Sequence, residues 1–432
     1  TMDSSTAQKP ILKTEAVAGI TTFFTMAYIV IVNPQILSAD GKTGMAFTGV
    51  LTATVIICFT MTLLMGLYAN LPFAVAPGMG INAFFTYTII LGKGVPWPTA
   101  LGIIFWAGVF FLLISITPVR ESIAKAIPAE LRIAAAAGIG MFLTFIGLKN
   151  SGFIVADPVT FVKLGALGKP ALLTILGLAI SVFFMARKNP FAFLAAIVAV
   201  TVVAWALGLV SAPSQVLTLP DFRSVLFKLD FLGALKLSLL PSIIAILFTD
   251  LFDSISTFIG VAHAADLLDE HGHPRNLKQG LIVDSLATMG AGLAGTSSGT
   301  AYIESVAGIS MGGRTGMTSV FTALCFLPCL FIAPLAGMVP AYATAAVLIL
   351  VGAAMFKSVG QIKFSKLEEG VPAFLTLILI PLTFSITQGI LWGFISHVGL
   401  YLMVGRRRDI HPVMYALALI SIGLLVLERV KT

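Results

Sequence analysis

The feature that most constrains this chain is a succession of apolar runs about 20 residues long, separated by short polar breaks. A helix of about 20 apolar residues is long enough to span the hydrocarbon core of a bilayer. Hydrophobic residues fill 58% of the 432 positions and charged residues only 10%, whereas a soluble domain carries about a quarter charged residues. The pattern predicts an all-α polytopic membrane protein.

Fourteen such runs form two groups of seven. The first group lies at roughly 15–36, 46–68, 71–91, 97–117, 131–149, 170–187 and 190–211. The second lies at roughly 237–262, 279–295, 297–312, 316–338, 340–357, 371–386 and 388–404. With a cytoplasmic N-terminus, the inner breaks hold about twice as many basic residues as the outer ones, as the positive-inside rule requires. A last apolar stretch, about 413–428, either crosses the bilayer or lies at its surface.

The formal charge of +7 does not indicate a nucleic-acid-binding protein, because the basic residues sit in the breaks between apolar runs. The three cysteines, Cys58, Cys325 and Cys329, lie inside apolar runs without polar metal ligands beside them. We therefore expect no metal site, no cofactor and no disulfide framework.

Two internal similarities suggest an inverted repeat of seven segments. Segment five contains AAAAGIGMFLTFIGLKNSG, and its counterpart seven segments later contains ATAAVLILVGAAMFKSVG. Segments three and ten are both short and interrupted, by FAVAPGMGINAFF and by GTSSGTAYIES. Paired broken segments at matching places in two halves indicate the binding site of a transporter. The alternative is that their glycines only let helices pack closely.

Four acidic residues lie well inside apolar segments, namely Asp250, Asp253, Asp284 and Glu304. A charge at mid-bilayer costs about 2.5–3.5 kcal/mol on insertion scales, so each of them needs a function or a partner. One face of the helix in segment eight would carry a polar stripe of Asp250, Asp253, Ser254 and Thr257. We expect this stripe to face a cavity, unless it belongs to a buried hydrogen-bond network that only joins helices.

Position within the segment suggests a role for each polar group. If a half-helix follows the break in segment ten, Glu304 occupies its first turn, where backbone amides favour an ionised carboxylate that binds substrate donors. The neighbouring Asp250 and Asp253 are better suited to carry a proton. Asn82 follows the break in segment three and either pairs with a heterocycle edge or caps a broken helix. Asp284 either takes part in coupling or links helices.

Several motifs together closely resemble bacterial guanine/hypoxanthine permeases of the nucleobase–cation symporter-2 family, in its purine branch. They are TTFFTMAYIVIVNPQIL, LPFAVAPGMGINAFF, TDLFDSISTFIGVA, GTSSGTAYIESVAGISMGGRTG and VPAFLTLILIPLTFSITQGI. The resemblance covers essentially the whole chain. It implies two inverted seven-segment repeats with short antiparallel strands in segments three and ten.

The resemblance also implies a division into domains. A core domain would comprise 1–118 (segments 1–4) and 236–338 (segments 8–11). A gate domain would comprise 119–235 (segments 5–7) and 339–404 (segments 12–14). Residues 405–432 would add a cytoplasmic basic turn and an extra apolar helix.

Carried over residue by residue, the resemblance matches Asp250 and Glu304 to acidic or amide residues that contact the base, with Asp250 linked to proton coupling, and Asn82 and Asp284 to family positions in segments three and nine. The candidate substrate-binding set is Glu304, Asp250, Asn82, Tyr302 and Ser298. The candidate proton-coupling set is Asp250, Asp253 and Asp284. The sequence DSISTFIG departs from the family's usual small Thr/Ser-Gly-Thr neighbours at Ser254, Ile255 and Ser256, which puts fine substrate preference in doubt.

We therefore predict a proton-coupled purine importer of the inner membrane that works by alternating access and prefers guanine and hypoxanthine. An adenine, xanthine or uracil carrier of the same fold is the first alternative. An intramembrane aspartyl protease is a remote one, because Asp250, Asp253 and Asp284 lack the G-x-G-D setting that such enzymes need. The expected partners are a purine base, protons and the lipid bilayer, with a homodimer as a candidate assembly.

Overall fold

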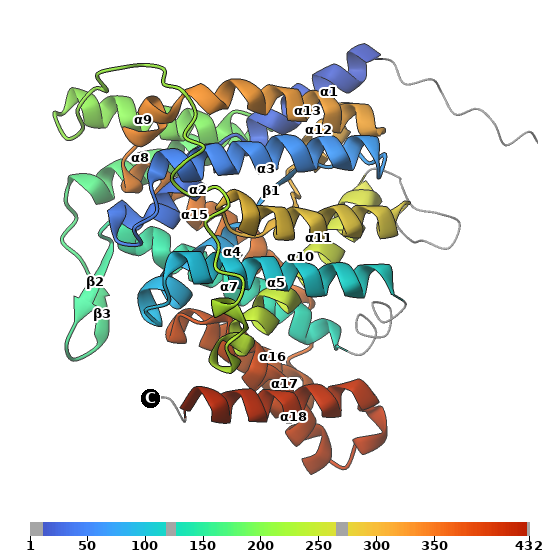
Figure 1. The fold of residues 1–432 in the computed structure, drawn as a ribbon. Helices are drawn as coiled ribbons and strands as arrows, with labels where there is room; N and C mark the ends of the chain where they lie inside the picture. The colour runs from blue at the N-terminus through green and yellow to red at the C-terminus, as the bar shows by residue number, and fades with distance from the viewer. Residues whose placement is uncertain (1–11, 118–126, 265–274, 430–432) are drawn as a thin grey trace, which may run out of the picture.

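The computed structural model describes residues 12–117, 127–264 and 275–429, which form a bundle of roughly parallel helices (Figure 1). Each of the fourteen predicted segments coincides with one or more helices, or with a short strand followed by a helix. Among the described helices, eight are long and apolar enough to cross a membrane, and four shorter ones are also apolar. The predicted all-α membrane fold is confirmed.

The first seven segments contain nine helices and one strand among the described residues. They are α1 (Leu12–Met26), α2 (Ile29–Ser38), α3 (Phe47–Leu67), β1 (Val75–Pro77), α4 (Met79–Ala83), the π-helix η2 (Phe84–Gly92), α5 (Trp97–Ile116), α7 (Ala129–Asn150), α8 (Lys169–Ala186) and α9 (Ala192–Ala206). A hairpin of β2 (Ile154–Asp157) and β3 (Phe161–Leu164) joins α7 to α8.

The second seven segments follow the same plan. They contain η4 (Leu237–Leu239), α10 (Leu240–Ala264), α11 (Leu277–Ala294), β4 (Gly299–Ala301), α12 (Ser305–Ser310), α13 (Gly316–Phe326), η5 (Leu327–Phe331), α14 (Ala333–Gly337), α15 (Ala341–Phe356), α16 (Leu367–Thr383) and α17 (Ile386–Met403). A last helix, α18 (Pro412–Arg429), follows the turn that contains η7 (Arg407–Asp409).

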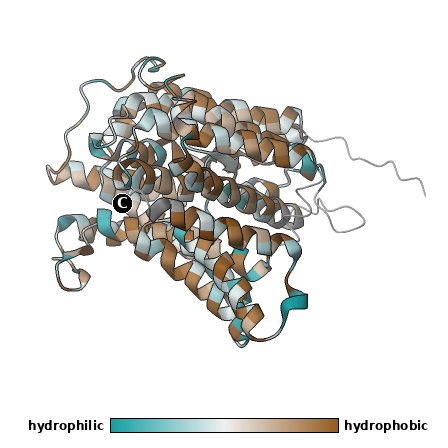
Figure 2. Ribbon diagram, turned by 60° about the horizontal axis from the view of Figure 1, so that its bottom comes forward, coloured by the Kyte–Doolittle hydropathy of each residue, from teal (hydrophilic) through white to brown (hydrophobic). Residues whose placement is uncertain are grey.

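The outside of the bundle is apolar, as a lipid-facing surface must be. On α8 and α9 the exposed side chains are large and hydrophobic, and they include Leu172, Val182, Phe183, Val202 and Trp205. Hydrophobic colours predominate along the helices in Figure 2. A contiguous apolar surface of this extent is rare in soluble monomers, so the surface agrees with the predicted membrane environment.

The helices pack in two groups. In one, α7 packs against α15, α16 and α17, and α15 also contacts α8 and α9. In the other, α3 contacts α2, α11 and α13, while α5 packs on α11 and α10. Helices of the first group come from segments five to seven and twelve to fourteen, and those of the second from the remaining segments.

The two similar glycine-rich segments, α7 and α15, pack directly on each other. A methyl group added at Gly140 would come within 2.6 Å of the carbonyl oxygen of Gly352, and one added at Gly352 would come within 2.3 Å of that of Gly140. Such contacts let two helix backbones approach closely. The sequence similarity therefore marks a helix pair that forms the centre of the first group.

The molecule has two opposite faces, which we name by their landmarks. The β2–β3 hairpin projects from one, the hairpin face, and the turn containing Arg406–Arg408 lies at the other, the basic face (Figure 1). The sequence predicts that the basic face is cytoplasmic.

The C-terminal helix α18 runs from the basic face back along α17. It packs on α17 and also touches α10 and η4, the short helix that directly precedes α10. Its buried residues Met414, Ala418 and Ser421 recur at helical spacing. Its 18 residues correspond to about 27 Å of helix, so α18 extends through most of the bundle's depth instead of lying across one face.

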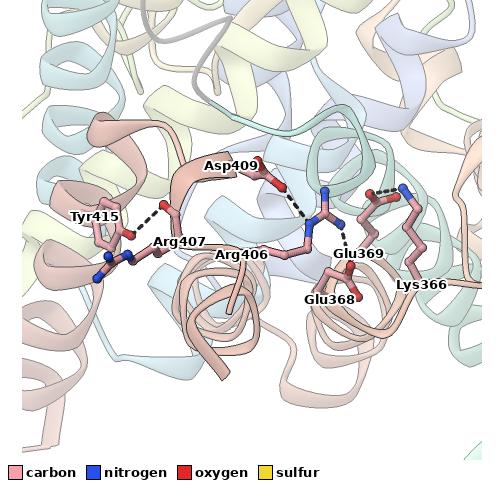
Figure 3. Close-up of polar contacts among 7 residues, drawn as sticks. All are labelled: Lys366, Glu368, Glu369, Arg406, Arg407, Asp409 and Tyr415. Carbon is pink, nitrogen blue, oxygen red and sulfur yellow. Dashed lines mark hydrogen bonds and ion pairs between the residues drawn. The ribbon is translucent and has the colours of Figure 1, made fainter. Parts of the chain in front are cut away.

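An ionic cluster holds the turn before α18 against the start of α16. Arg406 donates to Glu368 Oε1 at 2.6 Å and to Asp409 Oδ2 at 2.7 Å, and Tyr415 Oη donates to the carbonyl oxygen of Arg407 (Figure 3). Backbone amide bonding at the start of α16, together with the Arg406 guanidinium, lowers the pKa of the Glu368 carboxyl. The cluster fixes the direction in which the chain enters α18.

Candidate functional site

The two broken segments meet at the centre of the molecule. Strands β1 and β4 pair antiparallel, with Ala76 opposite Thr300, and the pairing continues through hydrogen bonds from the Gly78 amide to the Ser298 carbonyl (2.8 Å) and from the Tyr302 amide to the Ala74 carbonyl (2.9 Å). Short helices α4 and α12 follow the strands. The antiparallel strands predicted in segments three and ten are thus confirmed.

Neighbouring side chains satisfy the non-helical backbone of β1. The Val75 amide donates to Thr62 Oγ1 at 2.9 Å, and Thr62 Oγ1 donates back to the Val75 carbonyl at 3.1 Å. The Ala74 amide donates to Ser305 Oγ at 3.0 Å. Extended backbone at membrane depth is tolerated only where protein surrounds it, and these hydroxyl groups meet that requirement.

A cavity of about 200 Å³ lies beside the crossing of the two strands, between α10 and the helices α7 and α15. Its polar lining includes Asp253 and Thr257 from α10, Tyr302 and Glu304 from the β4–α12 segment, and Tyr28 from the start of α2. Met355 and Val351 of α15 and Ala136 of α7 form its apolar wall. We call it the carboxylate cavity.

Glu304 lies just before α12, as predicted, but its side chain is held differently. Its Oε1 accepts a hydrogen bond of 2.8 Å from the Tyr28 hydroxyl, and the side chain makes no capping bond to the amides of α12. Tyr28 lies where α1 ends and α2 begins, so that break directs the phenol towards the carboxylate. The predicted contact with amides at the helix start is replaced by a contact with Tyr28.

The predicted polar stripe on α10 divides into two. Asp253 and Thr257, four residues apart, line the carboxylate cavity. Asp250 and Ser254, also four residues apart, are fully buried and bond to α11 through Thr288 and Asp284. The two pairs point about 60° apart around the helix, which is enough to place one at the cavity and the other in the interior.

Behind the strands, Asp250 and Asp284 belong to a buried hydroxyl network. Thr288 Oγ1 bonds to Asp250 Oδ2 and lies 3.0 Å from the carbonyl oxygen of Gly299 in β4. Ser254 Oγ donates to Asp284 Oδ2, which Thr300 Oγ1 also approaches at 3.4 Å. The Oδ1 atoms of both aspartates lack a hydrogen-bond partner among the described residues. This network links α10 and α11 to the strand that borders the cavity.

Asn82 and Ser298 lie near the crossing without lining the cavity. Ser297 Oγ donates to Asn82 Oδ1, whereas Asn82 Nδ2 and Ser298 Oγ have no partner among the described residues. Both residues are fully buried. Of the predicted substrate-binding residues, Glu304 and Tyr302 therefore line the cavity in this conformation, and Asp250, Asn82 and Ser298 stand behind it.

Three polar residues near the site were not predicted. Tyr28 holds Glu304, and Asn33 Nδ2 donates to Thr54 Oγ1 at 2.6 Å and to Thr296 Oγ1 at 2.8 Å, fastening the segment before β4. Arg132 of α7 lines a smaller pocket that adjoins the cavity and includes Asp253. Each is an isolated polar residue in or beside an apolar run, and that signal could have identified them.

Within the described chain, no group of three or more His, Cys, Asp or Glu side chains could hold a metal.

An apolar helix bundle with two broken segments that cross beside a carboxylate-lined cavity is the architecture of a multi-pass membrane transporter. Residues 13–391 match the model of a permease family. The chain belongs to this family, the nucleobase–cation symporter-2 family, whose members are permeases and not enzymes.

Curated relatives match nearly the whole chain. Adenine permease AdeP of Escherichia coli (strain K12) is 44% identical over 95% of this chain and 92% of its own length. Putative permease MJ0326 of Methanocaldococcus jannaschii is 44% identical over 95% of this chain and 94% of its own length. Guanine/hypoxanthine permease PbuO of Bacillus subtilis (strain 168) is 38% identical over 96% of this chain and 97% of its own length.

Solved structures share the fold at low sequence identity. The transmembrane domain of the cyanobacterial bicarbonate transporter BicA matches with a TM-score of 0.65 and 18% identity, covering 88% of this chain and 97% of that one. Murine Slc26a9, an anion transporter in the inward-facing state, matches with a TM-score of 0.61 and 9% identity, covering 92% of this chain and 69% of that one. These matches concern the fold alone.

Proposed function

We propose that the chain is a proton-coupled importer of purine nucleobases that works by alternating access. The observation that supports it best is the carboxylate cavity, where Asp253 and Glu304 meet beside the crossing of β1 and β4. Asp253 and the free oxygen of Glu304 offer acceptors to the edge of a heterocycle, between the apolar walls of α7 and α15. The hydroxyl protons of Tyr28 and Tyr302 bond to Glu304 Oε1 and to the Pro77 carbonyl, so these hydroxyls add acceptor oxygens. Relatives with 35–44% identity bear the names of adenine or guanine/hypoxanthine permeases.

The division into a core (1–118 and 236–338) and a gate (119–235 and 339–404) is part of the proposal. The two packing groups of helices support it, since α7 and α15 pack tightly on each other and face α10 and β4 across the cavity. An elevator-like displacement of the core against the gate would carry the cavity from one face to the other.

Proton coupling is assigned to Asp250, with Asp284 and Asp253 as its carboxylate neighbours. The single hydroxyl proton of Thr288 faces two acceptors, the Asp250 carboxyl and the Gly299 carbonyl. A proton on Asp250 resolves the conflict, because Asp250 then donates to Thr288 while Thr288 donates to Gly299. Losing that proton would leave one acceptor of β4 or α10 unsatisfied and disturb the strand beside the substrate.

Two groups of purines are the candidate substrates. Guanine has adjacent donors, N1–H and the 2-amino group, which match both oxygens of a free carboxylate, and hypoxanthine keeps only N1–H. The bond from Tyr28 occupies one oxygen of Glu304, which weakens this match. Adenine is the second candidate, because AdeP and AdeQ, named adenine permeases, are 44% and 41% identical to this chain.

Uptake into proteoliposomes tests the proposal. The purified chain should accumulate labelled guanine, hypoxanthine or adenine when the outside is more acidic than the inside, and much less without the gradient. Each tenfold accumulation of a neutral base requires about 1.4 kcal/mol. Xanthine and uracil serve as competitors, and uptake that ignores the pH gradient for every base would refute proton coupling.

The proposed orientation places the basic face in the cytoplasm and the chain in the inner membrane. A cysteine at exposed Arg408 in a cysteine-free background should resist membrane-impermeant thiol reagents added to intact cells and react after permeabilisation. Strong labelling of intact cells would reverse the orientation.

The mass of the solubilised protein tests the homodimer, which is also part of the proposal.

A further inference from the structure

A second cavity lies on the hairpin-face side of the same seam between the two helix groups. This vestibule has a volume of about 730 Å³, and its lining includes Gln35, Asp40, Tyr87, Asn150 and Thr344. Leu209 and Val210, which follow α9, and Thr218 also line it. It is larger than the carboxylate cavity and is bordered by both helix groups.

The vestibule and the carboxylate cavity follow one another along α2 and α15. On α15, Thr344 and Leu348 line the vestibule, while Val351 and Met355 line the carboxylate cavity. Leu348 is only 1% exposed, and Val351 follows it by about 4.5 Å along the helix axis. On α15, a layer of less than one helical turn therefore separates the two cavities.

The same alternation holds on α2. Tyr28 lines the carboxylate cavity, Gln35 lines the vestibule, and Val32 lies between them on the same side of the helix, completely buried. Val32 on α2 and Leu348 on α15 are thus the buried side chains at the boundary between the two cavities.

Gln35 joins the two helices directly above this layer. Its Nε2 donates to the carbonyl oxygen of Val339 at 2.5 Å, and its Oε1 accepts from Thr344 Oγ1 at 2.8 Å. The Thr344 hydroxyl has a longer alternative, the Ala341 carbonyl at 3.0 Å within its own helix. One carboxamide therefore holds the beginning of α15, on both sides of Pro340, against α2.

Asn33, two residues earlier, has the opposite role. It points to the other side of α2 and bonds to Thr54 of α3 and to Thr296, both in the second helix group. Helix α2 is thus fixed to its own group by Asn33 and attached to α15 of the other group by Gln35.

We infer that Gln35 is a gating residue, whose two hydrogen bonds keep the vestibule separated from the carboxylate cavity. The inference rests on the proposed alternating access. When the core moves against the gate, these bonds must break so that Val32 and Leu348 part and a base can pass between the vestibule and Glu304. Weakening them shifts the resting population towards the conformation open at the hairpin face.

Labelling of a buried cysteine tests the inference without any substrate. In a cysteine-free background, L348C should react slowly with a membrane-impermeant thiol reagent applied from the hairpin face. Adding Q35L should raise that rate roughly tenfold, a shift of about 1.4 kcal/mol. T344V, which leaves the Gln35–Val339 bond in place, should raise it less, and in the Q35L background it should add nothing, because both changes remove the same bond.

Two comparisons separate gating from general loosening. The natural Cys58 of α3, restored as the single cysteine, is fully buried and lines neither cavity. It should not become more reactive in Q35L, because opening the path between the cavities leaves the interior of the second helix group closed. Q215L, at an exposed residue outside the vestibule lining, is the matched control and should leave L348C unchanged.

The inference fails if Q35L and T344V both leave the labelling rate of L348C within twofold of the parent, or if Q35L raises the labelling rates of L348C and Cys58 equally. Base binding and pH-driven uptake by the unmodified protein are measured separately. Normal uptake together with unchanged labelling would refute only the gating role of Gln35. Absent uptake of every purine would refute the proposed function.

Discussion

Asp250 and Asp253 are three residues apart on α10, yet the helix presents them to different surroundings. Asp253 faces the carboxylate cavity together with Glu304, whereas Asp250 is fully buried and meets Thr288 behind β4. A carboxylate at a cavity can contact a substrate directly. A carboxylate behind the strand can only influence the site through its proton and its hydrogen bonds. The comparison teaches that binding and coupling can be assigned to neighbouring residues of one helix.

The largest expected effect is the loss of coupling in D250N. The amide keeps the shape of the side chain but cannot release a proton, so accumulation driven by a pH gradient should fall at least tenfold, towards simple equilibration. Base binding at equilibrium should stay within a few-fold of the unmodified protein. Uptake with and without a gradient, together with binding, measures both quantities, and undiminished pH-driven accumulation would remove Asp250 from the coupling role.

D253N should have the opposite profile. Replacing a cavity-lining carboxylate by an amide leaves a donor of the bound base without its acceptor, which costs on the order of 1–3 kcal/mol, or roughly tenfold to a hundredfold in Kd. Equilibrium binding of guanine and adenine is the measurement. If D253N binds normally while D250N does not bind, the roles of the two aspartates are exchanged.

E304Q tests which purine uses the free oxygen of Glu304. Gln supplies a donor where guanine needs an acceptor. The binding of guanine should therefore weaken more than the binding of adenine, by about tenfold in relative Kd. Y28F is the companion variant, since it removes the bond to Oε1 but keeps the carboxylate. Y28F should strengthen the binding of guanine relative to that of adenine. Adenine outcompeting guanine at the unmodified protein would establish adenine as the preferred base.

The smallest effect is expected far from the cavity, in E368Q. Because the pKa of Glu368 is lowered in the folded protein by amide bonding at the start of α16 and by Arg406, its ionised form stabilises the fold at neutral pH. That contribution disappears as the pH falls through the lowered pKa. Thermal unfolding should show a slightly lower Tm for E368Q at neutral pH and no difference in acid, with transport unchanged. A transport defect would contradict the distinction between central and peripheral carboxylates.

The sequence by itself determined the class of fold and the place of the two paired strands along the chain. Apolar runs of spanning length predicted the helices, because a helix satisfies its backbone within one segment in lipid and needs about 20 residues to cross, whereas a barrel strand needs only about half as many. The same rule made the interruptions at Pro77–Gly78 and Ser298–Gly299 conspicuous, and these became the paired strands β1 and β4. Isolated carboxylates in such runs were also conspicuous, because a charge there is costly.

Only the tertiary structure decided which polar group meets which. Helical spacing placed Asp250 and Asp253 on one stripe. Their side chains nevertheless point about 60° apart around α10, which is enough for one to face the cavity and the other the interior. The packing of α11, α7 and α15 around α10 determines where the boundary between cavity and interior lies. The contacts of Glu304 with Tyr28 and of Gln35 with Val339 and Thr344 join residues more than 270 positions apart. Side-chain hydrogen bonds across such separations depend on distances of tenths of an ångström, which no local pattern in a sequence encodes.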